Sequence, residues 1–161
     1  MMEIQIEEYQ IYILDSVLEI MGNYKQTDRK SPEAGGVLLG QVKNNRVYIM
    51  KVSTPSIRDR SSRTSFIRNK KVAQSIIDYE FTNSKKKTIY LGEWHTHPEK
   101  HPKPSGVDLK MIFDQYKRNN LNEPFLLLII QGTGGLYIGF VNNNGLTGIN
   151  INDQFHCKCK S

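Results

Sequence analysis

Cysteine and long apolar runs are scarce in this chain of 161 residues, and each shortage excludes a class of protein. Two cysteines cannot form the disulfide framework of a small secreted domain. The longest apolar run, residues 125–130, is far shorter than the roughly 20 residues of a membrane-spanning helix. Hydrophobic residues make up 38% and charged residues 24%, a composition that excludes intrinsic disorder and fibres. We therefore expect one globular domain, close to the usual size of about 150 residues.

The two ends of the chain carry little that specifies function. The N-terminal residues Met-Met-Glu-Ile-Gln-Ile-Glu-Glu lack the basic and then apolar pattern of a signal peptide, so we expect a cytoplasmic protein without membrane association. Near the other end, His156, Cys157 and Cys159 allow two interpretations, a second metal site or a reduced flexible tail. We favour the tail, because structural zinc sites gather four ligands at wider spacings. The domain is accordingly expected at residues 1–150 and the tail at 151–161.

Positive charge is in excess, with 22 Lys and Arg against 16 Asp and Glu, a net charge of +6. The basic residues gather at 58–71, at 85–87 and around 100–110, but Phe66 is the one aromatic residue in the first cluster. No RNA-recognition or zinc-finger signature accompanies them. We interpret them as a solvated face, not a nucleic-acid-binding surface, and leave a negatively charged partner as an open alternative.

The hydrophobic pattern predicts an α/β fold, a sheet with helices packed on it. Helices are predicted over residues 9–21, from Val72 to a point before the lysines at 85–87, and after Ser105. Strands are predicted at 37–42, 46–52, 88–97, 125–131 and 136–141, and loops at 53–63 and 98–104.

One segment outweighs the rest, His95-Thr-His97-Pro followed by Pro104-Ser105-Gly-Val-Asp108. Side chains at positions i and i+2 of a strand project to the same face, so His95 and His97 present two imidazoles together. Asp108 follows a proline-rich loop and opens a helix, where its carboxylate can fold back toward the strand. Two histidines and one carboxylate leave a fourth position open, as in catalytic zinc sites.

Other interpretations of these residues remain open from the sequence. Ser105-x-x-Asp108 is also a capping-box pattern, although capping and metal ligation can coexist. His101 competes as third ligand, although we expect it to be a bystander or a substrate contact. Glu93 shares the face of His95 and His97 and could be a ligand or orient an imidazole. The base that a metal site needs could be Glu33, one acidic residue of 16, which stands just before the first apolar strand.

Together, Glu33, His95-x-His97-Pro and Pro104-Ser105-x-x-Asp108 resemble the JAMM motif of JAB/MPN-domain zinc metallopeptidases, whose best-known members cleave isopeptide bonds to ubiquitin and ubiquitin-like proteins. The resemblance implies a single MPN/JAB-like α/β domain with a central mixed β-sheet flanked by helices. It implies one zinc ion per chain held by His95, His97 and Asp108. Glu33 would be the general acid/base, and Ser105 would stabilise the oxyanion. No motif position is substituted, whereas family members that serve only as scaffolds have typically lost ligands.

The segment Gly92-Glu-Trp-His-Thr-His-Pro is similar to the bacterial JAB branch, including the deconjugating isopeptidases of anti-phage cyclic-oligonucleotide (CBASS) operons. This similarity implies hydrolysis of (iso)peptide bonds at the C-terminus of a ubiquitin-like modifier, or of a target protein conjugated in the same manner, such as a nucleotide cyclase. Two alternatives from other classes are a DNA-repair-associated MPN-like nucleic-acid-binding module and a non-catalytic MPN scaffold.

Overall fold

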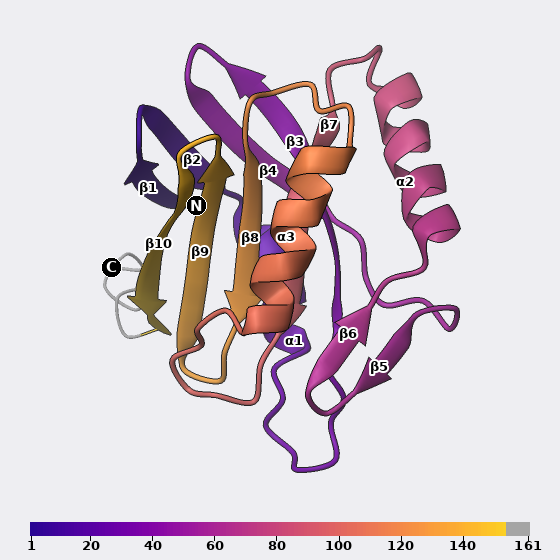
Figure 1. The fold of residues 1–161 in the computed structure, drawn as a ribbon, viewed down its shortest axis with the longest axis vertical. Helices are drawn as coiled ribbons and strands as arrows, with labels where there is room; N and C mark the ends of the chain where they lie inside the picture. Colours follow the sequence, from indigo (N-terminus) through magenta and orange to yellow (C-terminus); the bar gives the residue numbers. More distant parts are fainter. Residues whose placement is uncertain (154–161) are drawn as a thin grey trace.

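The central element of the fold is a mixed sheet of eight strands, seen in a computed structural model that describes residues 1–153 (Figure 1). Its strands are β1 (Met2–Ile6), β2 (Tyr9–Ile13), β3 (Gly35–Lys43), β4 (Arg46–Val52), β7 (Ile89–Thr96), β8 (Leu126–Gln131), β9 (Gly135–Asn142) and β10 (Gly145–Asn152). They are ordered β1-β2-β4-β3-β7-β8-β9-β10. The β2–β4 and β7–β8 pairs are parallel, and all other pairs in this sheet are antiparallel.

Helices cover both faces of the sheet, which confirms the predicted α/β class with a central mixed sheet flanked by helices. They are α1 (Asp15–Asn23), α2 (Lys70–Asn83) and α3 (Gly106–Arg118). The side chains of successive residues in β8 project to opposite faces of the sheet, as the period of a strand requires. Leu128 packs with Ile112 of α3, whereas Leu127 and Ile129 belong to the apolar cluster that contains Val17 of α1. In Figure 1, α3 and α2 lie in front of the sheet and α1 behind it.

The sequence pattern predicted most of these elements. The predicted strands at 37–42, 46–52, 88–97, 125–131 and 136–141 are confirmed as β3, β4, β7, β8 and β9. The helices expected from Val72 and after Ser105 are confirmed as α2 and α3. None of the helices within residues 1–153 has the length and apolarity needed to cross a membrane.

The helix predicted over residues 9–21 is wrong in its first part, because Tyr9–Ile13 is strand β2 and the helix begins at Asp15. Tyr9, Ile11 and Ile13 are all buried, with half-exposed residues between them, so this segment also fits the period of a strand. Its backbone pairs with β1 on one side and β4 on the other, and these pairings decide in favour of the strand.

Four strands were not predicted: β1, β10 and the two strands of a small hairpin, β5 (Arg60–Ser62) and β6 (Ser65–Ile67). The hairpin overlaps the end of the loop expected at residues 53–63. The tail expected at 151–161 starts inside β10, whose last residue is Asn152, and its residues from 154 onward lie outside the described part of the chain.

A bulge in β7 sets the direction of the side chains that precede the histidines. Leu39 pairs with Tyr90 and Leu38 with Gly92, so Leu91 is an extra residue in β7. Gly92 has a φ of 150°, and a Cβ there would lie 1.9 Å from the carbonyl oxygen of Leu127 in β8. Only glycine therefore allows β7 and β8 to pair this closely at the bulge.

Candidate metal centre

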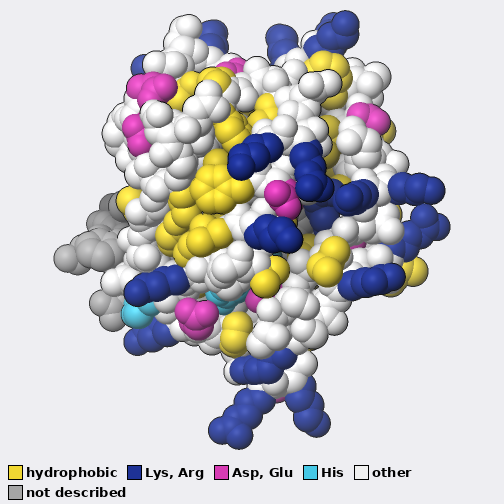
Figure 2. All heavy atoms as spheres, viewed as in Figure 1, with side chains coloured by type: hydrophobic (Ala, Val, Ile, Leu, Met, Phe, Trp, Pro, Cys, Tyr) yellow, Lys and Arg dark blue, Asp and Glu magenta, His cyan; other side chains and the backbone are white. Residues whose placement is uncertain are grey.

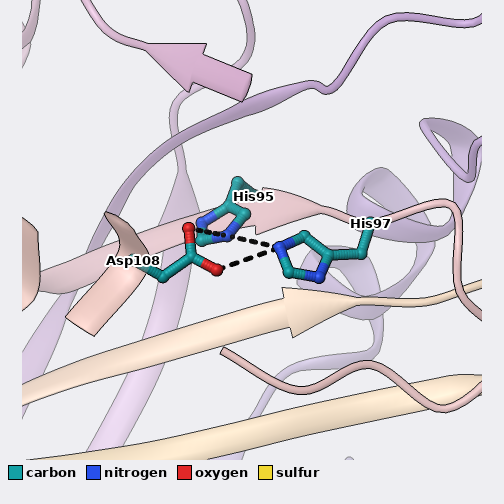
Figure 3. Close-up of side chains that lie close together, drawn as sticks. All are labelled: His95, His97 and Asp108. Carbon is teal, nitrogen blue, oxygen red and sulfur yellow. Dashed lines mark hydrogen bonds and ion pairs between the residues drawn. The ribbon is translucent and has the colours of Figure 1, made fainter. Parts of the chain in front are cut away.

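Three side chains converge at the end of β7 and the start of α3 (Figure 3). His95 Nε2 lies 3.1 Å from Asp108 Oδ1, and His97 Nε2 lies 3.0 Å from Asp108 Oδ2. The two imidazole Nε2 atoms are 3.2 Å apart. Both histidines are buried, and the Asp108 side chain is 13% exposed. The structure therefore brings together the three residues that the sequence motif spreads over positions 95 to 108.

The spacing of the three side chains is compatible with one bound metal ion, because one ligand atom from each residue lies within 4.8 Å of the others. Zinc with bonds of about 2.0–2.1 Å to nitrogen and oxygen places neighbouring ligand atoms about 3.3 Å apart in a tetrahedron. The two Nε2 atoms are 3.2 Å apart, close to that value, and each lies 3.0–3.1 Å from a different oxygen of the Asp108 carboxylate. Two imidazoles and a carboxylate are also ligand types that zinc accepts. Within residues 1–153, this is the one cluster of three or more His, Cys, Asp and Glu side chains arranged to hold a metal ion.

Asp108 takes part in the capping box of α3 and also contacts both imidazoles. Ser105 is the N-cap of α3: its Oγ accepts a hydrogen bond from the Asp108 N–H, and Asp108 Oδ2 accepts one from the Ser105 N–H. This capping box fixes the carboxylate of Asp108 while both its oxygens face the imidazoles. Burial alone would raise the pKa of Asp108, but hydrogen bonds from His95 and His97 outweigh it and hold that pKa well below its usual range.

Glu33 lies beside the cluster although it is far from it in sequence. Its Oε1 atom is 3.7 Å from His97 Nε2, and its side chain is 5% exposed. Burial raises the pKa of Glu33 to about 7, a rise that the nearby His97 opposes and that Asp108 and Glu99 reinforce. A carboxyl with a pKa near neutrality can both accept and release a proton at physiological pH.

Thr96 holds Glu33 in place, and the sequence interpretation missed it. Ala34 donates its N–H to Thr96 Oγ1 and accepts a hydrogen bond from the Thr96 N–H. The Thr96 hydroxyl in turn donates to Gln26 Oε1, and the Glu33 N–H donates to the Ser62 carbonyl in β5. The residue between the two histidines thus links the Glu33 backbone to β7. Its place in the His-x-His motif was the one signal that could have revealed this link.

Glu99 is a second residue that the sequence interpretation missed. It lies on the far side of His97, where its Oε1 atom is 3.3 Å from His97 Nδ1, a buried nitrogen without a hydrogen-bond partner among the described residues. Burial lowers the pKa of His97, but Asp108, Glu33 and Glu99 outweigh it and raise that pKa overall. A histidine that binds metal through Nε2 carries its proton on Nδ1, the nitrogen that faces the Glu99 carboxylate at ion-pair distance.

The two competing ligands are not part of the cluster. The carboxylate of Glu93 accepts hydrogen bonds from Arg68 Nε, at 2.6 Å, and from the Tyr90 hydroxyl, at 3.0 Å. Burial raises the pKa of Glu93, and Arg68 opposes the rise. His101 is exposed in the loop before α3. The possible second metal site with Cys157 and Cys159 lies outside the described residues.

Comparison with known proteins gives one family and several relatives. The family described as prokaryotic homologs of the JAB domain matches residues 17–140. Proteins named CD-NTase/cGAS isopeptidase are similar over most of their length. The one from Escherichia coli is 33% identical over 80% of each chain, and the one from Vibrio cholerae is 31% identical over the same shares. The one from Pseudomonas aeruginosa is 32% identical over 84% of this chain and 85% of its own.

A solved structure supports the fold alone. The solution structure of protein DSY2949 from Desulfitobacterium hafniense superposes with a TM-score of 0.62 over 86% of this chain and 89% of that one. The two sequences are 18% identical, so this similarity extends to the architecture and not to the chemistry.

Proposed function

The chain belongs to the prokaryotic homologs of the JAB domain, and on this basis we propose that it is a zinc-dependent isopeptidase of the JAMM metalloprotease type. The observation that carries the proposal is the convergence of His95, His97 and Asp108, with the protonatable carboxyl of Glu33 beside them. Relatives named CD-NTase/cGAS isopeptidase support the reaction class. A scaffold protein would have no need for an intact ligand set beside a buried base.

The proposed substrate is a protein joined through its C-terminus to an amine of another protein. The names of the relatives point to a nucleotidyltransferase of the CD-NTase or cGAS type as the conjugated protein. A ubiquitin-like modifier with the same kind of linkage is the related substrate class. The proposed role is removal of this conjugate in anti-phage defence of the CBASS type.

The mechanism assigns a proton transfer to Glu33. A zinc ion bound by His95, His97 and Asp108 would supply a Lewis acid that polarises the scissile carbonyl and activates water. Glu33 accepts a proton from the attacking water and delivers it to the leaving amine nitrogen as the C–N bond breaks. In the metal-free chain burial raises the pKa of Glu33 to about 7, so this carboxyl can gain and lose a proton near neutral pH.

Ser105 has a separate role in the mechanism. Its Oγ accepts a hydrogen bond from the Asp108 N–H, which leaves its own O–H free to donate. This O–H stabilises the negative charge that develops on the carbonyl oxygen of the substrate. The capping box holds Ser105 at the first turn of α3, so the donor is in position before the substrate arrives.

A cleavage assay with matched variants tests the proposal. The substrate is a CD-NTase-type protein whose C-terminus is fused to a reporter or linked to a lysine side chain. We expect the zinc-loaded protein to release the reporter, and Glu33→Gln to bind zinc but release none. Glu19→Gln, at an exposed position of α1, is the matched control and should cleave at the unmodified rate. Equal cleavage by Glu33→Gln would refute the assigned base, and no cleavage by the unmodified protein would refute the function.

A further inference from the structure

A groove with a volume of about 320 Å³ lies between α2 and α3, outside the metal centre. Met111, Gln115 and Arg118 of α3 line one side. Arg68, Lys70 and Gln74, from the start of α2 and the residues before it, line the other. The proposed mechanism uses none of these residues.

Helix α3 carries both Asp108 of the metal centre and one side of the groove. Asp108, Met111, Gln115 and Arg118 are spaced by 3, 4 and 3 residues, so they form one stripe on the helix. At a rise of about 1.5 Å per residue, the stripe extends about 15 Å from the metal ligand to Arg118. An extended chain rises about 3.3 Å per residue, so this length matches four or five residues of an extended peptide.

Arg68 joins the other side of the groove to the same site. Its Nε donates to Glu93, which stands two residues before His95 on the same face of β7. Glu93 is buried, so this ion pair holds the guanidinium beside the strand that carries the two histidines. Arg68 also lines the groove, and its side chain is 18% exposed, so part of it remains accessible to a ligand.

The groove carries an excess of positive charge. Lys70 and Arg118 form no ion pair with any residue of the described chain, and Asp114 is the one acidic side chain in the lining. Figure 2 shows Lys and Arg side chains gathered over the region between α3 and α2. An occupant with negative charge would complement this surface, whereas a basic one would be repelled.

We propose that this groove binds the C-terminal segment of the conjugated protein, on the acyl side of the cleaved bond, and selects acidic side chains in it. The inference rests on the proposed isopeptidase function. A C-terminal segment can enter the groove in extended form, whereas the lysine on the other side of the bond projects from a folded surface. Acidic residues two to five positions before the cleaved bond fall within the length of the groove.

The test compares fusion substrates that carry either Glu or Gln at these positions. We expect the unmodified protein to cleave the Glu substrates with a kcat/KM about 3- to 10-fold higher, the range of a few exposed ion pairs. The preference should weaken as salt is added. The double variant Lys70→Gln/Arg118→Gln should bring the Glu-to-Gln ratio close to one. Arg68 is left intact, because its removal would leave Glu93 buried without a partner.

A control variant separates the groove from net charge alone. Lys43→Gln/Arg46→Gln removes two positive charges at the exposed β3–β4 turn and should keep the full preference. Anisotropy with labelled Glu and Gln peptides on the Glu33→Gln protein measures binding without cleavage, and the same preference is expected.

The outcomes distinguish this inference from the proposed function. Cleavage of Glu and Gln substrates with equal kcat/KM would overturn the inference and leave the isopeptidase function standing. Charge-selective binding without any cleavage would overturn the isopeptidase function and support the groove. Tighter binding of single-stranded DNA than of the acidic peptide, lost in Lys70→Gln/Arg118→Gln, would assign the groove to nucleic acid and overturn the inference.

Discussion

Replacing Glu33 with glutamine is expected to stabilise the metal-free protein at alkaline pH, although the same change removes the proposed base. Glu33 is buried, and burial raises its pKa from an ordinary value of 4.5 to about 7 in the folded chain. The unfolded chain therefore loses this proton first as the pH rises. Because the unfolded state binds fewer protons between these two values, the free energy of unfolding falls across this range. Above this pH range, the folded protein bears the full free-energy cost of a buried carboxylate.

The size of this effect follows from the two pKa values. The difference between 4.5 and about 7 corresponds to about 3 kcal/mol. The neutral glutamine side chain would avoid this cost, and loss of the contact with His97 makes the figure an upper value.

Urea denaturation of the metal-free protein at about pH 4 and about pH 8 measures the effect. The variant should gain stability over the unmodified protein at the higher pH and have nearly the same stability at the lower one. Glu19→Gln, at an exposed site, should show no such difference. Two results would refute this account of the buried carboxyl. One is a Glu33→Gln protein that is less stable than the unmodified protein at the higher pH. The other is a difference in the free energy of unfolding that is the same at both pH values.

Three further predictions concern the centre and its support. Glu99→Gln should lower the affinity for zinc about 10- to 100-fold in a chelator competition. The stability of the metal-free protein should not change, because Glu99 is 54% exposed. An unchanged zinc affinity would show that Glu99 does not support the metal centre. Ser105→Ala should reduce kcat about 10²- to 10³-fold with zinc retained, and loss of the cap should cost about 1 kcal/mol in thermal denaturation. A loss of stability without a loss of kcat would leave Ser105 only its capping role. Gly92→Ala should destabilise the fold by about 3 kcal/mol or more, because the new Cβ would lie 1.9 Å from the Leu127 carbonyl oxygen. A small change in the denaturation midpoint would contradict the close pairing of β7 and β8.

The metal ligands could be predicted from sequence because their geometry is mostly local. His95 and His97 share a face of β7 through the period of a strand, and Asp108 follows a capping residue at the start of a helix. The helices α2 and α3 and the inner strands were likewise predictable from hydrophobic periodicity. Each of these features is determined by residues of a single element or of consecutive elements in the chain.

The support of the site could not be predicted in the same way, because it depends on pairing between distant segments. Glu33 comes close to His97 because β3 pairs with β7, with Gly35 opposite His95. The hydrogen bonds between Ala34 and Thr96 follow from that register. The carboxylate of Glu93 was correctly placed on the histidine face, but the position of its partner Arg68, before α2, has no local signal.

The strand β2 shows a different limit of sequence reasoning. A short amphipathic segment fits both the helical and the strand period, and the choice depends on its neighbours. Here β1 and β4 supply the backbone partners on both sides of Tyr9–Ile13. The edge strand β10 begins with a glycine and none of its residues is fully buried, so its pattern was too weak to indicate a strand.

Titration of zinc into the metal-free protein, with isopeptide cleavage followed at each addition, tests the central claim most directly. The account predicts that activity rises in proportion to bound zinc and reaches its maximum at one ion per chain. Asp108→Ala, which lacks one ligand, should bind no zinc at these concentrations and remain inactive. Full cleavage by the metal-free protein, or an inactive protein with one zinc ion bound at His95, His97 and Asp108, would contradict it.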